Sequence, residues 1–213
     1  MLSNEIIFFA FLSYLTGAIP SAVWLGKIFY KVDVREFGSG NEGATNTFRV
    51  LGKGAGIPVL LIDIIKGWMA VNYVCLLHNT TELSIVNPNL YFEIKLAFGI
   101  FAVIGHLFPV YIGFRGGKGI ATMLGLLIGL HPLAALYTLL VFILIFIFFK
   151  YVSLASIIAS FTFPLIIIFF LSIDIYSLQL FSIFVPILSL ITHQKNIERL
   201  VRGEETKVNF DKK

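Results

Sequence analysis

Glycine, small hydroxyl residues and asparagine concentrate in one short stretch of this sequence, "FGSGNEGATNTFR", residues 37–49. Successive small residues can direct consecutive backbone N–H groups at one point, and such nests bind phosphate, especially where a helix begins. Arg49 can add two parallel hydrogen bonds to an anion. A flexible surface turn is the alternative, because the same residue types dominate turns. The residues that we predict to form this phosphate site are Ser39, Gly40, Asn41, Gly43, Ala44, Thr45, Asn46 and Arg49.

A second glycine-rich and basic stretch, "GHLFPVYIGFRGGKGIAT", covers residues 105–122. It lacks the G-x-x-x-x-G-K-[ST] spacing of a Walker A loop. We interpret it as a second cradle for an anion, and the alternative is a tight turn between two helices. His106 is expected to be a structural helix residue. The predicted binding residues of this stretch are Gly116, Gly117, Lys118, Gly119 and Thr122.

The third polar cluster, "HQKNIERLVRGEE", occupies residues 193–205. His193 and Asn196 are spaced to lie one helical turn apart, side by side at the end of the last apolar segment. Neutral histidine is the usual proton carrier near pH 7. An amphipathic tail on the membrane surface is the alternative for this cluster.

Ionisable and hydroxyl residues also occur at the edges of, or inside, apolar segments. Asp63 and Lys66 stand one turn apart in "DIIKG", where unpaired charges in a membrane helix cost several kcal/mol. A functional pair and a buried structural ion pair both remain open. Ser153 and Ser156 begin another segment, either as a helix N-cap or facing the same site.

The segments that must position these clusters have the composition of an integral membrane protein. The 213 residues are 58% hydrophobic and 13% charged, and their mean hydropathy is +0.91. A membrane span needs about 20 apolar residues. Proline interrupts a helix, so the longest segment is expected to divide at Leu130-His131-Pro132. The predicted spans are roughly residues 6–28, 56–77, 94–112, 119–130, 132–149, 153–173 and 176–192.

Lysine and arginine gather in alternate connections between the predicted spans, as the positive-inside rule requires. We therefore predict an all-α seven-transmembrane-helix bundle with its N-terminus outside and its C-terminus in the cytoplasm, forming a single domain over residues 1–213. The three polar clusters then converge on the cytoplasmic face. This topology accounts for the net charge of +4, so no nucleic-acid partner is predicted.

Motifs for several other chemistries are absent from the sequence. No Cys/His cluster has metal-ligand spacing, no G-x-S-x-G marks a hydrolase nucleophile, and no Rossmann pattern occurs. We therefore predict no metal and no cofactor. The competing class is a transporter for a phosphorylated solute, which Asp63 and Lys66 inside a span would suit.

The three clusters, in their order and spacing, resemble the signature motifs of the bacterial acyl-phosphate:glycerol-3-phosphate acyltransferases, the PlsY family. The resemblance extends from Gly17 to about Glu205 and includes "DIIKG" and "YVSLASI". Glu42 departs from the family pattern, where proline or an aliphatic residue is common. A carboxylate beside a phosphate nest repels the substrate unless it points away.

The resemblance implies transfer of a fatty acyl group from acyl phosphate to the 1-hydroxyl of sn-glycerol 3-phosphate, the first committed step of phospholipid synthesis. It implies a site on the cytoplasmic side of the bacterial inner membrane, with no acyl-CoA donor and no obligate protein partner. Ser39 and the backbone of residues 40–45 would hold phosphate, while Arg49 and Lys118 would neutralise charge. His193 and Asn196 would orient the glycerol hydroxyl or the donor. The predicted substrate-binding set also includes Lys66 and Glu204.

Overall fold

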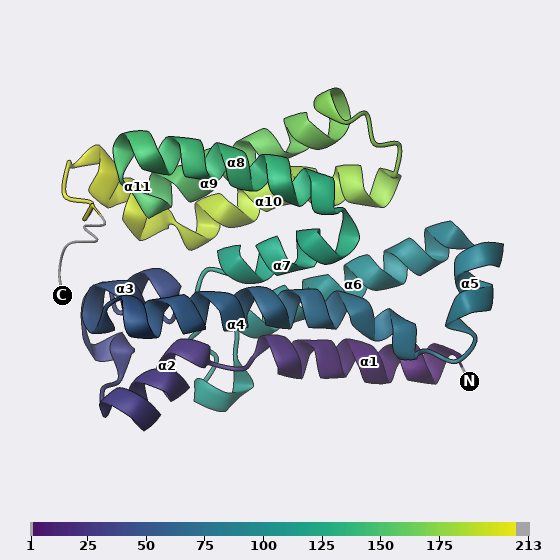
Figure 1. Ribbon diagram of the computed structural model, residues 1–213, viewed down its shortest axis with the longest axis horizontal. Helices are drawn as coiled ribbons and strands as arrows, with labels where there is room; N and C mark the ends of the chain where they lie inside the picture. Colours follow the sequence, from purple (N-terminus) through teal and green to yellow (C-terminus); the bar gives the residue numbers. More distant parts are fainter. Residues whose placement is uncertain (1, 208–213) are drawn as a thin grey trace. The chain divides into compact units, whose positions relative to one another are not determined.

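The computed structural model describes residues 2–207, which form helices and turns without a β-strand in that range (Figure 1). The helices group into two compact units, Met1–Leu130 and His131–Lys213. A helical protein is what the sequence predicts. The assignment of a single domain over residues 1–213 stays a prediction.

The first unit contains seven α-helices joined by short 3-10 or π turns. The turns are η1 (Gly26–Tyr30), η2 (Val34–Glu36), η3 (Tyr73–Leu76) and η4 (Val110–Ile112). The helices are α1 (Leu2–Gly17), α2 (Ser21–Leu25), α3 (Ala44–Leu51), α4 (Lys53–Asn72), α5 (Thr80–Val86), α6 (Pro88–Leu107) and α7 (Ile120–Leu130).

Two close helix pairs hold the first unit together, α1 with α6 and α4 with α7, and α6 also contacts α4 (Figure 1). Glycine makes the close approach possible. A Cβ atom at Gly67 of α4 would overlap the carbonyl oxygen of Thr122 in α7, and one at Gly125 of α7 would overlap the carbonyl of Ile64. Small residues at such interfaces let backbones approach where lipid supplies no hydrophobic driving force. The short helices α2 and α3 lie at the end of this unit opposite α5 (Figure 1).

Between residues 131 and 207 the second unit contains four helices, α8 (Pro132–Phe149), α9 (Val152–Leu165), α10 (Tyr176–Thr192) and α11 (Gln194–Val201), and the π turn η5 (Ile166–Phe170). Helix α9 packs against both α8 and α10. His131 caps α8 by accepting a hydrogen bond at Nδ1 from the N–H of Ala134, at 3.2 Å. The predicted division at Leu130-His131-Pro132 is therefore confirmed.

Other helix limits differ from the limits of the predicted spans, and the differences have local causes. The segment 6–28 is not one helix, because α1 ends at Gly17 and the chain bends by 45° before continuing from Ser21 to Tyr30. Helix α6 begins at Pro88 rather than 94, since Asn87 caps it by accepting from the N–H of Leu90 at 3.1 Å. The connection after α4 contains α5, and α11 follows α10 at an angle of 67°.

Four helices within residues 2–207 are long and apolar enough to cross a membrane, or up to six if each bent pair is one span. Helix α7, with 11 residues, is shorter. Large apolar side chains are exposed along α8, as a lipid-facing helix requires, among them Leu136, Leu140, Ile143 and Phe148. The count of seven spans and the orientation of the termini stay predictions.

Candidate active site

Asn46 organises the first glycine-rich stretch. Its side chain is 2% exposed, and its Oδ1 accepts hydrogen bonds from the backbone N–H of Ser39 at 2.8 Å and from the Ser39 hydroxyl at 3.1 Å. Its Nδ2 donates to the carbonyl oxygens of Val34 at 2.7 Å and Phe37 at 3.2 Å. A Cβ atom at Gly38, whose φ is +63°, would overlap Asn46 Oδ1. Asn46 therefore shapes the loop from within, by hydrogen bonds to three residues on its near side.

Helix α3 begins where this loop ends. Gly43 is its N-cap residue and has no side chain to cap the first turn. The first N–H groups of a helix have no partner within the helix, so those of Ala44 and Thr45 are available to an anion. Arg49 lies on the last turn of the same helix and is half-buried.

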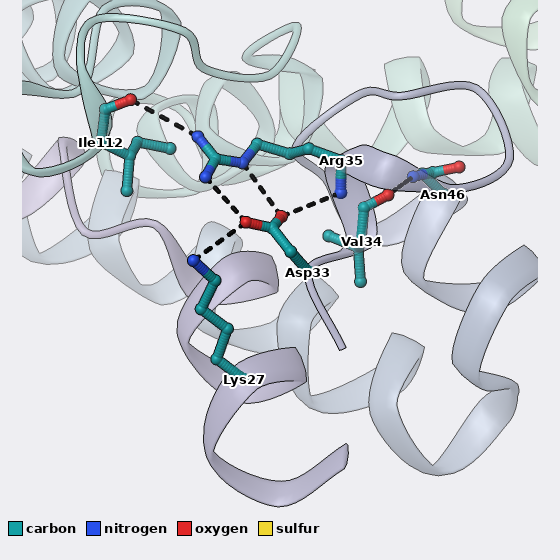
Figure 2. A network of polar contacts seen from close by, with 6 residues as sticks. All are labelled: Lys27, Asp33, Val34, Arg35, Asn46 and Ile112. Atoms are coloured by element: carbon teal, nitrogen blue, oxygen red, sulfur yellow. Dashed lines mark hydrogen bonds and ion pairs between the residues drawn. The ribbon is translucent and has the colours of Figure 1, made fainter. Parts of the chain in front are cut away.

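A network of charged groups fixes the chain just before the loop (Figure 2). Arg35 donates to Asp33 from Nε at 3.0 Å and from Nη2 at 2.8 Å, and Lys27 Nζ lies 3.0 Å from Asp33 Oδ2. The hydrogen bonds from Arg35 hold the pKa of Asp33 well below its ordinary range. Arg35 Nη1 also donates to the carbonyl of Ile112 at 3.5 Å, which links this network to η4, just before the second loop.

The second glycine-rich loop folds back on the end of α6. The N–H of Gly116 donates to the carbonyl of Leu107 and that of Gly117 to the carbonyl of His106, both at 3.2 Å. A Cβ atom at Gly117 would overlap both the carbonyl oxygen of Glu42 and Nε2 of His106. Glycine is therefore required there, and the first two loops are in direct contact. Lys118 is half-buried in this loop.

A cleft of about 370 Å³ lies between these two loops. Two arginines, two carboxylates and two glycines line it, and they are Asp33, Arg35, Glu36, Gly40, Arg115 and Gly116. Arginine is well suited to phosphate because its planar donors match pairs of oxygens. Sequence reasoning assigned no binding role to Arg35 or Arg115, although Arg35 lies just before the first stretch and Arg115 lies within the second.

Beneath the loops, Asp63 and Lys66 form a buried ion pair. Asp63 Oδ1 lies 2.9 Å from Lys66 Nζ and accepts a hydrogen bond from the hydroxyl of Ser21 at 2.7 Å. Lys66 Nζ also donates to the carbonyl of Ile19 at 3.0 Å. Both charged residues are at most 2% exposed. The structural ion pair that the sequence left open is thus present, and substrate binding by Lys66 stays a prediction.

Histidine 106 lies next to this pair, with Nδ1 3.7 Å from Asp63 Oδ1, and is 3% exposed. The structural role expected for it stays a prediction. Thr122, predicted to bind substrate, is fully buried in α7, and its hydroxyl has no hydrogen-bond partner among residues 2–207.

Glu42 turns inward from the first loop. It is 2% exposed, and its Oε1 accepts the backbone N–H of Ala22 in α2 at 3.4 Å. Burial, reinforced by the negative charge of Asp63, raises the pKa of Glu42 to about 7. The carboxyl therefore points away from the loop's outer face. This orientation is the one that the sequence requires if Glu42 is not to repel a phosphate bound by the loop.

The third predicted cluster is organised by Glu205, which sequence reasoning missed. Its carboxylate accepts hydrogen bonds from Ser153 at 2.9 Å, Asn196 at 2.8 Å and Arg199 at 2.9 Å. Burial opposes ionisation, but these three donors outweigh it and lower the pKa of Glu205. The neighbouring Glu204, which was predicted to bind substrate, is exposed. The local signal for Glu205 is Gly203, whose φ of +73° lets the chain turn back.

His193 lies at the bend between α10 and α11, at the end of the last apolar segment. It is 2% exposed, and its Nδ1 is 2.9 Å from the carbonyl oxygen of Ser189. The N–H of Asn196 donates to the carbonyl of His193 at 2.8 Å across the bend. The interpretation of Ser153 or Ser156 as a helix N-cap is wrong, because Tyr151 is the N-cap residue of α9. The Ser156 hydroxyl instead donates to the carbonyl of Val152.

Within residues 2–207, no three His, Cys, Asp or Glu side chains are placed to hold a metal ion. The first and second loops meet, as predicted, within the first unit. Convergence of the third cluster with them stays a prediction.

Comparison with known proteins agrees with this arrangement. The glycerol-3-phosphate acyltransferase family model matches residues 7–203. Glycerol-3-phosphate acyltransferases of Staphylococcus aureus strains Newman and bovine RF122 are 43% and 44% identical over 205 residues, covering 96% of this chain and 98% of theirs.

Two crystal structures of PlsY, an integral membrane glycerol 3-phosphate acyltransferase, also match the fold. The glycerol 3-phosphate form has a TM-score of 0.82 at 34% identity, and the lysophosphatidic acid form 0.79 at 33%, each covering 96% of both chains. Fold and sequence together define an integral membrane acyltransferase of phospholipid biosynthesis. The chain belongs to the glycerol-3-phosphate acyltransferase family, the PlsY family, and the resemblance drawn from the sequence is confirmed.

Proposed function

We propose that this protein transfers a fatty acyl group from acyl phosphate to the 1-hydroxyl of sn-glycerol 3-phosphate, producing lysophosphatidic acid and inorganic phosphate. The observation that carries the proposal is the contact between the two glycine-rich loops, whose shared cleft is lined by Arg35 and Arg115. Both substrates carry phosphate, and family membership adds independent support. Neither loop has the pattern of a nucleotide site, so acyl phosphate is the donor that we propose.

The chemistry is a displacement at the acyl carbonyl. The glycerol 1-hydroxyl oxygen bonds to the carbonyl carbon, the bond from that carbon to the phosphate oxygen breaks, and the hydroxyl proton passes to a phosphate oxygen of the leaving group. Acyl phosphate is a mixed anhydride, so no covalent enzyme intermediate, metal or cofactor is needed. Positioning of the two substrates and stabilisation of developing negative charge account for the rate.

Residues of both loops supply that stabilisation in the proposed mechanism. The N–H groups at the start of α3 hold phosphate, and the Ser39 hydroxyl turns from Asn46 Oδ1 to a phosphate oxygen when the substrate binds. Arg49 and Lys118 neutralise charge on the glycerol phosphate and the departing phosphate. His193 and Asn196 orient the glycerol hydroxyl, and His193 is the alternative proton acceptor. The site lies on the cytoplasmic side of the inner membrane, and lipid surrounds the acyl chain.

The direct test is purified protein supplied with palmitoyl phosphate and labelled glycerol 3-phosphate, with lysophosphatidic acid as the readout. Turnover is expected with palmitoyl phosphate and not with palmitoyl-CoA. Lys118→Ala is expected to lose nearly all turnover, while Lys118→Arg retains part of it because the positive charge remains. Turnover with palmitoyl-CoA alone would contradict the proposed donor.

The variant His193→Ala tests whether the third cluster takes part in catalysis or has only a structural role. If His193 orients or deprotonates the glycerol hydroxyl, turnover per folded molecule falls by about 100-fold or more. Because His193 is buried, the melting temperature also falls, so turnover must be normalised to folded protein. Retention of more than half of the wild-type turnover per folded molecule would remove His193 from the mechanism.

Orientation has its own test. Single cysteines at Asn79 and Glu204, introduced into a Cys75→Ser background, are expected to react with an impermeant reagent from opposite sides of intact cells. Reaction of both from the outside would refute the proposed cytoplasmic site.

A further inference from the structure

Glu42 is a buried ionisable group to which the proposed mechanism gives no role. It occupies the first loop directly before Gly43, the N-cap of α3, where the N–H groups assigned to phosphate begin. Its side chain passes behind the loop to α2 and is 2% exposed. The carboxyl is therefore placed against the inner side of the loop backbone.

The surroundings of Glu42 supply little compensation for a negative charge. Asp63 and Lys66 of α4 act on Glu42 electrostatically, and they are paired with each other at 2.9 Å. Arg35 of η2 is hydrogen-bonded to Asp33. No cation among residues 2–207 forms an ion pair with Glu42, whose hydrogen bond comes from the neutral N–H of Ala22.

The remaining neighbours pack on the backbone of Glu42. Gly117 of the second loop meets its carbonyl oxygen, and the same Cβ atom added at Gly117 would also overlap Nε2 of His106 of α6. Glu42 thus sits where both loops, α2 and the buried polar pair come together. A change in its charge acts on both loops.

We propose that Glu42 sets the affinity of the site for the phosphate of glycerol 3-phosphate, which binds best when the Glu42 carboxyl is neutral. This inference rests on the proposed function. An ionised Glu42 places a negative charge behind the loop that holds the phosphate dianion. Burial of Glu42 keeps water from screening the repulsion between the carboxylate and the phosphate. A neutral carboxyl still accepts the N–H of Ala22, so protonation leaves the loop in place.

The linkage has a definite sign. Phosphate raises the pKa of a nearby carboxyl, so binding takes up a proton and is strongest where Glu42 is already protonated. The pKa of Glu42 in the substrate-free protein is raised to about 7 by burial first and by Asp63 second. Affinity for glycerol 3-phosphate therefore falls as pH rises through about 7, and a rise of one unit in the pKa on binding gives about a tenfold loss.

Glu42→Gln is the matched variant, since it keeps the size and the acceptor oxygen but has no charge to gain. Glu82→Gln, on the exposed surface of α5, is the control. The KM for glycerol 3-phosphate is measured from pH 6 to 8.5 with saturating palmitoyl phosphate. We expect the KM of the wild type and of Glu82→Gln to rise with pH by a factor about tenfold larger than the factor for Glu42→Gln. The change in KM that remains in Glu42→Gln comes from titration of the substrate phosphate.

Calorimetry measures the same linkage without turnover. Glycerol 3-phosphate is titrated into each protein at pH 7 in two buffers that differ in ionisation enthalpy, which gives the number of protons taken up. The wild type is expected to take up more protons than Glu42→Gln. Glu42→Ala, which is also neutral, is expected to match Glu42→Gln and serves if the glutamine variant does not fold.

The outcomes distinguish the two proposals. If the wild type binds glycerol 3-phosphate with proton uptake that the neutral variants lack but makes no lysophosphatidic acid, the proposed function fails and the role of Glu42 stands. If the wild type is active and the neutral variants share its pH dependence of KM and its proton uptake, the role of Glu42 is refuted and the function stands.

Discussion

Removing the carboxylate of Asp63 is expected to be among the most damaging single changes in this protein. Asp63 is 1% exposed and is the counter-ion of Lys66, itself 2% exposed. Asp63→Asn keeps the size of the side chain and removes its charge. The ammonium of Lys66 then remains buried beside the carbonyl of Ile19, without the carboxylate that neutralises it.

Breaking one partner of a buried ion pair costs about 3–5 kcal/mol, because the remaining charge is uncompensated. Removing both charges with Asp63→Asn and Lys66→Met together is expected to cost about 2 kcal/mol or less, since neutral groups of similar volume often replace such a pair. The single change is therefore more harmful than the double one. For a protein of this length, about 3–5 kcal/mol corresponds to a fall of roughly 10 °C in Tm.

The assay is thermal unfolding of the purified protein in detergent, with turnover per folded molecule measured on the same samples. Glu198→Gln is the control, because Glu198 forms an exposed pair with Arg202 and its loss is expected to leave Tm unchanged. If Asp63→Asn lowers Tm by less than the double variant, the argument from an uncompensated charge is wrong. If the folded double variant retains turnover, Lys66 is not a substrate ligand.

Three further predictions follow from packing and pKa. Gly67→Ala is expected to lower Tm clearly, because its Cβ overlaps the backbone of α7, whereas Gly54→Ala meets only the hydroxyl of Tyr30 at 3.4 Å and is expected to be neutral. Glu42 has a raised pKa, so the stability linked to its protonation is fully present below pH 4.5 and is lost as pH rises through about 7. The free energy of unfolding of Glu42→Gln is therefore expected to exceed that of the wild type by up to about 3 kcal/mol at pH 8, and the excess is expected to vanish at pH 4.5. Glu205 has a lowered pKa, so its contribution is present above its ordinary pKa and lost as pH falls through the folded value; the Tm deficit of Glu205→Gln is expected at pH 7 and to shrink on acidification, and a constant deficit would show that charge is not its cause.

Local sequence was sufficient wherever a few neighbouring residues decide the structure. Pro132 cannot continue a helix from the preceding turn, so the division before α8 could be predicted. Residues three apart on a helix face the same side, so pairing of Asp63 with Lys66 was among the interpretations. The glycine-rich loops and the family could be recognised for the same reason, since their residue types and spacing are contiguous in the chain.

Contacts between distant residues were beyond such reasoning. The bend follows Gly17, where α1 lies so close to α6 that a Cβ atom would overlap the backbone of Ala102. Glu205 rather than Glu204 joins Ser153, 52 residues away, because the turn at Gly203 selects which of two adjacent carboxylates points inward.

The same distinction applies to the first site. The sequence by itself determined that glycine and basic residues would form two loops suited to phosphate. Only tertiary structure decided that Gly117 meets Glu42 and that the Glu42 carboxyl is buried behind the loop. The physical reason is that burial and electrostatic environment are properties of the space that α2, α4 and α6 enclose together, and no single segment of the chain carries them.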